Sequence, residues 1–207
     1  MPGSPAFGKV YTGMMLHKFF EAGLIRRVVD VGAGSGTYRK LLINEGPGAT
    51  WVAVEAWKPN IGEYALETLY DEVLNEDVRQ VDFTTLGPDL VVFGDVLEHM
   101  TKEEAQEVVG RALATARYVM ISIPIIHYPQ GEIDGNPFER HVKEDWSHNE
   151  VCDSFPDLVT CLVHDHIGVY FLSRRPDAIG QLIKVHDVVS PIVQRQFGEA
   201  IQLSDHI

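Results

Sequence analysis

The sequence predicts an α/β domain organised around a doubly wound sheet, and two observations carry this prediction. Short β-branched apolar runs recur along most of the chain, and helix-like segments lie between them. Strand–helix alternation of this kind is typical of an open, mostly parallel sheet with right-handed crossovers. The 207 residues suit one domain with a single large core.

The expected strands are nearly unbroken apolar runs, which are typical of parallel strands covered on both faces. A half-exposed strand would instead alternate apolar and polar residues. Four runs of this kind are Val28–Val31, Trp51–Val54, Leu90–Phe93 and Tyr118–Ile123. A further strand is expected to end at Asn75–Val78, and the last strand is expected at Gly168–Leu172.

Helices are expected between these strands, at Thr37–Asn44, Ile61–Tyr70 and Lys102–Thr115. The third has the clearest start, because Thr101 and Glu104 form the pattern of a capping box, in which each side chain satisfies the other's backbone amide.

We assign residues 1–175 to the domain and residues 176–207 to a C-terminal extension of one or two helices, interrupted at Pro191. The extension packs either on the domain or on a second copy of the chain. Residues 124–146 are rich in Pro, Gly, Asp and Asn and are therefore expected to be a loop. Loops of this length in a domain are usually functional or disordered. We expect this insertion to close over a modest polar molecule, with Tyr128, Phe138 and Trp146 in its lining.

The composition narrows the classes of partner. A formal net charge of −13 speaks against broad nucleic-acid binding, which depends on basic side chains that neutralise phosphates. The longest apolar stretch, 118–126, falls short of the ~20 residues that a membrane span needs. We therefore expect a cytoplasmic protein that acts on a small molecule.

The strongest local signal is the segment from Val28 to Thr37, VVDVGAGSGT, in which a buried strand runs into three alternating glycines and then a helix. Glycine permits a tight turn and lets a ligand approach the backbone, while the helix start offers unpaired amides. A dinucleotide fingerprint would need Gly at position 37, which is Thr here. The carboxylate of Asp30 would repel a pyrophosphate and attract an ammonium group. The turn therefore favours a ligand with a positive group and no diphosphate.

Two later acids fit the same ligand. Glu55 ends the run that begins at Trp51, where a carboxylate can accept both hydroxyls of a ribose. Asp77 could accept from an adenine amino group, with a backbone amide beside it at Val78.

These segments, followed by Asp95-Val-Leu-Glu-His-Met100, resemble the ordered motifs of class I S-adenosylmethionine-dependent methyltransferases over roughly residues 28 to 125. The resemblance implies a Rossmann-like, doubly wound, seven-stranded sheet that is mostly parallel and ends in an antiparallel hairpin, here Leu158–Val163 with Gly168–Leu172. It implies S-adenosylmethionine as cofactor, with Asp30 and the glycine turn at its methionine portion and Asp95 beside the sulfonium. The implied cofactor-binding residues are Asp30, Gly32, Ala33, Gly34, Ser35, Gly36, Glu55, Ala56, Trp57, Asp77, Val78 and Asp95.

Methyl transfer requires mainly alignment of the acceptor and exclusion of water. We favour a hydroxyl oxygen over nitrogen as the acceptor, and a hydroxyl needs a base. The candidate bases are His99, His127 and His141.

A less favoured alternative is a divalent metal held by Asp95, Glu98, His99 and His141. Metal-dependent O-methyltransferases of the ubiquinone-pathway and small-RNA 3′-end types carry a similar motif, but with Glu at the position of Asp95.

Two other function classes stay open at this point. One is an NAD(P)-dependent oxidoreductase, against which Asp30 and Thr37 both count. The other is a non-catalytic subunit that binds S-adenosylmethionine as a sensor or pairs with an active partner. The same motifs would serve such a subunit, because they support cofactor binding whether or not turnover follows. The methyl acceptor itself cannot be read from a fold or a cofactor site.

Overall fold

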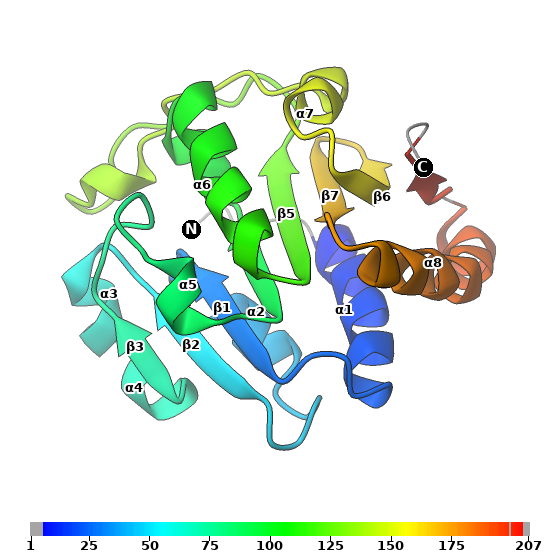
Figure 1. Ribbon diagram of the computed structural model, residues 1–207. Helices are drawn as coiled ribbons and strands as arrows, with labels where there is room; N and C mark the ends of the chain where they lie inside the picture. Colours follow the sequence, from blue (N-terminus) through cyan, green and yellow to red (C-terminus); the bar gives the residue numbers. More distant parts are fainter. Residues whose placement is uncertain (1–5, 199, 205–207) are drawn as a thin grey trace.

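Eight strands form one mixed sheet in the computed structural model, which describes residues 6–198 and 200–204 (Figure 1). The strand order is β3-β2-β1-β4-β5-β7-β6-β8. The strands are β1 (Arg27–Val31), β2 (Thr50–Val54), β3 (Glu72–Leu74), β4 (Leu90–Gly94), β5 (Tyr118–Pro124), β6 (Leu158–His164), β7 (Ile167–Leu172) and β8 (Gln202–Leu203).

The first five strands are parallel, and the chain reverses its direction of progress across the sheet between β1 and β4. β1 pairs with β2 on one side and with β4 on the other, Val29 lying opposite both Val52 and Val91. Loops that leave the carboxyl ends of β1 and β4 therefore run in opposite directions, which opens a crevice where ligands bind in such sheets. The predicted doubly wound sheet is confirmed.

The predicted antiparallel hairpin is also confirmed, because β7 lies antiparallel to both β5 and β6. One strand comes in addition to the expected seven. β8 contributes two residues that pair with Thr160 and Cys161 of β6. The sequence analysis placed this segment in the helical extension. It missed the strand because two residues are too few to produce an alternating pattern.

The predicted helix at Lys102–Thr115 is confirmed with its bounds, and so is its capping box. The Glu104 amide donates to Thr101 Oγ1 at 3.2 Å, and the Thr101 amide donates to Glu104 Oε2 at 2.8 Å. The α-helices are α1 (Ala6–Glu21), α2 (Thr37–Leu41), α3 (Lys58–Glu63), α4 (Leu66–Leu69), α5 (Phe83–Leu86), α6 (Lys102–Thr115), α7 (His148–Ser154) and α8 (Pro176–Phe197). Two short 3₁₀ turns, Leu97–His99 and Pro137–Glu139, complete the set for the described residues.

Two helix expectations need correction. The segment expected as one helix at 61–70 is broken at Ala65, whose φ of 51° is incompatible with a continuous helix, so that α3 and α4 are separate. Conversely, α8 runs through Pro191 as a single helix. Within the part of the chain that the structure describes, none of the helices combines the length and the apolar character that a membrane span needs.

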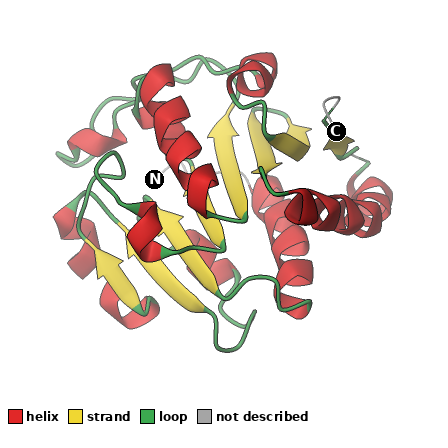
Figure 2. Ribbon diagram, viewed as in Figure 1, coloured by secondary structure: helices red, strands yellow, loops and turns green. Residues whose placement is uncertain are grey.

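The two faces of the sheet bury two hydrophobic cores, which explains the unbroken apolar strands. On β1, Val29 and Val31 point into a core shared with α5, α6 and α7, whereas Val28 points into one shared with α1, α2 and α8. Figure 2 shows α6 crossing in front of the sheet. The predicted insertion at 124–146 falls almost entirely in the loop between β5 and α7, residues 125–147. This loop runs along the carboxyl edge of the parallel strands, at the top of Figure 1.

Gly94→Ala is expected to lower the free energy of unfolding by about 2 kcal/mol or more, because overpacking in a filled core forces neighbours to shift. A Cβ at Gly94 would lie 1.9 Å from Cε2 of the buried Tyr38 ring. The matched control is Gly110→Ala in α6, where an added Cβ would meet no described atom within 4 Å apart from the backbone of its own helix and its chain neighbours. That variant should be stabilised by roughly 0.5–1 kcal/mol through helix propensity. Urea denaturation of both variants checks this, and equal stabilities would contradict the packing at Tyr38.

Candidate functional site

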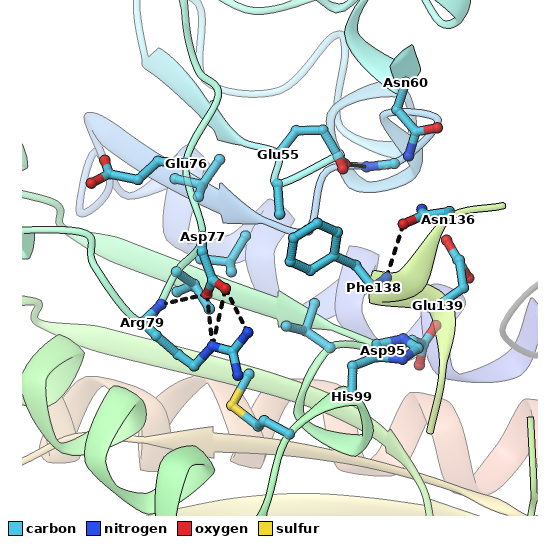
Figure 3. A pocket seen from close by; sticks show the side chains of 18 residues that line it. Glu55, Asn60, Glu76, Asp77, Arg79, Asp95, His99, Asn136, Phe138 and Glu139 are labelled. Atoms are coloured by element: carbon cyan, nitrogen blue, oxygen red, sulfur yellow. Dashed lines mark hydrogen bonds and ion pairs between the residues drawn. The ribbon is translucent and has the colours of Figure 1, made fainter. Parts of the chain in front are cut away.

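A cavity of about 140 Å³ opens at the carboxyl ends of β1, β2 and β4, beneath the insertion (Figure 3). It lies at the crevice where the strand order reverses. The residues that the sequence analysis assigned to a cofactor and that line it are Gly32, Gly34, Glu55, Ala56, Asp77 and Val78, together with Asp95. His99 lines it as well. Segments separated by more than sixty residues in the chain therefore meet in one place.

The glycine turn has the backbone that its sequence predicts. Gly32 has a φ of 62°, and a Cβ there would lie 2.6 Å from Cγ2 of Val96. Gly34 has a φ of 50°, and a Cβ there would meet only the Gly32 carbonyl oxygen, at 3.7 Å. Gly32 therefore allows close packing of the turn on the loop after β4, whereas Gly34 leaves backbone open to the cavity.

Glu55 is buried, with its carboxylate held between two backbone amides. The amide of Gly34 donates to Oε2 and the amide of Trp57 donates to Oε1, both at 2.8 Å. Burial raises the pKa of Glu55, and the two amides partly offset that rise. Each carboxylate oxygen has a second lone pair, so the group can still accept hydrogen bonds from a ligand.

Asp77 forms an ion pair with Arg79, whose Nη2 lies 2.6 Å from Asp77 Oδ2. Burial opposes ionisation of Asp77, but hydrogen bonds from Arg79 outweigh it and lower the pKa of this carboxyl. Arg79 also pairs with Glu104 at 3.0 Å. This network connects the loop after β3 to the start of α6.

Asp95 lies directly after β4 with a φ of 58°, a backbone region that non-glycine residues rarely adopt. Its amide donates to the Ser122 carbonyl at 2.9 Å, and the Ser122 hydroxyl donates to Asp95 Oδ1 at 3.1 Å. Such conformations persist where the surroundings enforce them and are concentrated at functional sites. β5 therefore fixes the Asp95 side chain at the cavity wall.

Glu98, His99 and His141 form a cluster at the insertion side of the cavity. They place ligand atoms within 4.8 Å of one another, and the two imidazole centroids are 5.0 Å apart. Nδ1 of His99 donates to the Arg140 carbonyl at 3.2 Å, and Nδ1 of His141 donates to the Tyr128 carbonyl at 2.6 Å. Because a carbonyl oxygen can only accept, these bonds place a proton on Nδ1 of each ring.

Burial controls ionisation in this cluster. It lowers the pKa of His99 to about 4, which keeps this ring neutral near pH 7. Burial, assisted by the charge of Asp95, raises the pKa of Glu98 well above its usual range. Among the described residues, Glu98 Oε2 has no hydrogen-bond partner although it is buried. Asp95 does not belong to the group of three, so the metal set expected from the sequence is brought together only in part.

Several expected site residues lie outside the cavity lining. Asp30 is fully buried on the α2 side of the sheet, where Tyr70 donates to its carboxylate at 2.5 Å. His127 is exposed, and His141 is buried. The other residues expected at the cofactor that do not line the cavity are Ala33, Ser35, Gly36 and Trp57.

The insertion covers the cavity, but not with the residues that the sequence indicated. Trp146 is buried in the core against Phe155, and Tyr128 packs on His141. Of the three expected aromatic residues, only Phe138 lines the cavity, beside Asn136 and Glu139. The Asn-Pro pair at 136–137 signals a turn, but a turn signal does not say which side chains face inward.

The charged side chains of the lining are predominantly acidic. Carboxylates of Glu55, Glu76, Asp77, Asp95 and Glu139 line the cavity, against the single guanidinium of Arg79 in the described lining. Because low-dielectric walls strengthen this field, the cavity favours a ligand that is neutral or positively charged.

No protein-family model matches the chain, and no curated protein matches it. Solved structures do match. The N-terminal domain of EvdMO1 with SAH bound is 16% identical, with a TM-score of 0.57, and the match covers 79% of this chain and 81% of that one.

A second match is an S-adenosylmethionine-dependent methyltransferase from Clostridium acetobutylicum, which is 9% identical with a TM-score of 0.58 over 79% of this chain and 90% of that one. A third is the mitomycin 7-O-methyltransferase MmcR, 14% identical with a TM-score of 0.57 over 82% of this chain and 54% of that one. The chain thus spans about half the length of MmcR. At these identities the likeness concerns the fold: the chain has the fold of class I S-adenosylmethionine-dependent methyltransferases.

Proposed function

We propose that the protein is an S-adenosylmethionine-dependent methyltransferase that acts on a small-molecule acceptor, at a hydroxyl oxygen. The observation that carries the proposal is the convergence of the glycine turn, Glu55, Asp77 and Asp95 on one acidic cavity at the strand reversal. An acidic lining suits a cationic sulfonium and disfavours a pyrophosphate. The similar EvdMO1 domain has SAH bound.

In this proposal the cofactor lies across the carboxyl ends of the parallel strands. Glu55 accepts the ribose hydroxyls, Asp77 and the Val78 amide meet the adenine, and Asp95 lies near the sulfonium. The amides of the glycine turn hold the methionine portion. Asp30 does not contact the cofactor, in contrast to our sequence interpretation, because its carboxylate is directed into the core.

The chemical step needs an aligned acceptor and a proton acceptor, since the bound sulfonium already activates the methyl carbon. His99 lines the cavity, its lowered pKa keeps the ring neutral, and its Nδ1 carries the proton, so that Nε2 is the atom that takes the hydroxyl proton. His141, behind it, orders the insertion. The insertion excludes water from the reacting atoms.

Calorimetric titration with S-adenosylhomocysteine, and with NAD as control, tests the proposal. Binding of S-adenosylhomocysteine alone supports it and justifies a screen of hydroxyl acceptors. Binding of NAD alone would favour the oxidoreductase. Cofactor binding without turnover of any acceptor would favour the non-catalytic subunit. A cytoplasmic location, the 175/176 boundary and a homo-oligomer stay predictions from the sequence.

His99→Ala is expected to lower turnover of the acceptor found in that screen by about 100-fold, which is typical for loss of a proton acceptor. Affinity for S-adenosylhomocysteine should change little. His127→Ala is the matched control, because this histidine is exposed and lies outside the cavity lining. Equal turnover of the two variants would remove His99 as the base.

A metal-assisted version of the reaction is the second candidate. It is favoured by the buried Glu98 Oε2, which has no hydrogen-bond partner among the described residues, and by two imidazoles whose ligand atoms lie within 4.8 Å of that of Glu98. The oxygen and nitrogen donors of Glu98, His99 and His141 fit a divalent ion. A bound ion would lower the pKa of an acceptor hydroxyl. Calorimetric titration with Mn²⁺ or Zn²⁺ tests it without turnover, and Glu98→Gln should abolish any heat of binding. The absence of binding in the wild-type protein would exclude this candidate.

A further inference from the structure

The side chain of Phe138 projects from the insertion into the middle of the cavity. In Figure 3 its ring is directed toward Glu55 and Asp77, which come from the ends of β2 and β3 on the opposite wall. The residue keeps 38% of its surface exposed. A large aromatic ring thus faces the acidic side chains across the cavity, with part of its surface exposed.

The turn that holds Phe138 is fixed within itself. The amide of Phe138 donates to Asn136 Oδ1 at 3.0 Å, as drawn in Figure 3, and the amide of Asn136 donates to the Ile133 carbonyl at 2.8 Å. The Asn136 side chain is buried, and Gln130 Nε2 donates to the Glu139 carbonyl at 2.7 Å. The ring is therefore presented by an ordered turn.

The same segment is also attached to the cavity wall. The Glu98 carbonyl accepts from the amides of Val142 at 2.8 Å and Lys143 at 3.1 Å, and His99 donates to the Arg140 carbonyl. These bonds connect the segment after Phe138 to the 3₁₀ turn after β4. A side chain held in this way can contact a ligand without a large cost of ordering on binding.

We propose that Phe138 belongs to the nucleoside-binding site and packs its ring against the adenosine portion of the bound cofactor. The inference rests on the proposed function, which puts ribose at Glu55 and adenine at Asp77. The ring is directed between these two acids, and every base offers a π-face to an aromatic side chain. Trp57, which the sequence analysis assigned to the cofactor, does not line the cavity. The insertion thus contributes to cofactor binding in addition to covering an acceptor.

Calorimetric titration of the full chain with S-adenosylhomocysteine and with 5′-methylthioadenosine tests this. The second probe keeps the nucleoside and lacks the amino acid portion. Phe138→Ala should weaken binding of both probes by about 10-fold or more, the effect of losing one base–aromatic stack. Phe138→Tyr should retain affinity, because it keeps the ring. Val142→Ala is the matched control from the same segment, since Val142 is exposed and does not line the cavity.

The outcomes separate this inference from the proposed function. If the wild-type protein binds neither probe, the proposed function fails and takes the inference with it. If the wild type binds and Phe138→Ala binds equally well, only the inference fails. Tighter binding by Phe138→Ala would overturn it as well, because the ring would then occlude the site. A loss confined to S-adenosylhomocysteine would place the ring at the amino acid portion and overturn the nucleoside contact. Phe138→Leu, which keeps apolar volume, replaces the alanine variant if that variant fails to fold.

Discussion

Glu55→Ala is expected to reduce affinity for S-adenosylhomocysteine by at least about 100-fold, the largest effect on ligand binding that we expect from one side chain. Two losses combine. The ribose hydroxyls lose a charged acceptor, and each hydrogen bond to a charged group contributes roughly 1.5–3 kcal/mol. The amides of Gly34 and Trp57 lose their acceptor too, so the glycine turn and the residues after β2 each lose a hydrogen bond that holds them in place. Calorimetry of the purified variant measures the change.

Glu55→Gln separates the effect of the negative charge on ligand affinity from the effect of the hydrogen bonds that hold the turn. Its amide oxygen can still accept from one of the two backbone amides, so the turn should keep part of its support while the anionic acceptor is absent. Burial raises the pKa of Glu55, and ligand binding needs the ionised form. The affinity of the wild type should therefore fall as the pH drops through that pKa, whereas the affinity of the Gln variant should not fall in this pH range. Wild-type affinity in Glu55→Ala would refute the ribose assignment.

Asp30→Asn is expected to stabilise the protein at pH 8. Burial raises the pKa of Asp30 to about 7, against an ordinary value of 3.8, and the hydrogen bond from Tyr70 offsets only part of this. The difference between these two pKa values corresponds to roughly 4 kcal/mol, the free-energy cost of keeping Asp30 ionised in the folded protein. An asparagine keeps the shape and can still accept from the Tyr70 hydroxyl, without the charge.

The pH dependence gives this prediction its sign. Because the folded-state pKa is raised, the native protein binds the extra proton between about pH 4 and pH 7, and stability falls as the pH rises through this window. The advantage of Asp30→Asn should therefore be small near pH 4 and reach its full size at pH 8. Urea denaturation at pH 4 and pH 8 measures it. A wild type as stable as the variant at both pH values would contradict a strained, buried carboxylate.

Tyr70→Phe provides a control of opposite sign. It removes the donor to Asp30 and leaves the carboxylate without that hydrogen bond, so it should destabilise the protein at pH 8. In the Asp30→Asn background the same change should cost less, because no charge depends on the tyrosine. Equal costs in both backgrounds would show that the two side chains do not interact.

The sequence predicted the elements that depend on interactions between residues close together in the chain. The capping box at Thr101 gave the start of α6, and the apolar runs gave the strands of the parallel sheet. The break at Ala65 was not predictable, because alanine has no preference for the left-handed conformation that it adopts there. β8 was missed because two residues carry no periodicity.

Site residues followed the same division. The acids at the carboxyl ends of strands, Glu55 and Asp95, were predicted because a parallel sheet brings these ends together. Asp30 lies within β1, where side chains alternate between faces, and it shares its face with Val28 and not with the cavity. Phe138 lies in irregular backbone, where no repeat indicates which side chains point inward.

The attachment of the insertion to the carbonyl of Glu98 has a consequence for how this cavity could diversify. The bonds from Val142 and Lys143 are made by backbone amides, so they do not depend on which side chains the segment carries. Point changes along it can therefore alter what the cavity accepts while the position of the segment is retained. A segment held in place by its side chains would instead lose part of that support with such a change. Backbone anchoring of this kind gives a protein evolvability: new acceptors can be tried one substitution at a time on an unchanged frame.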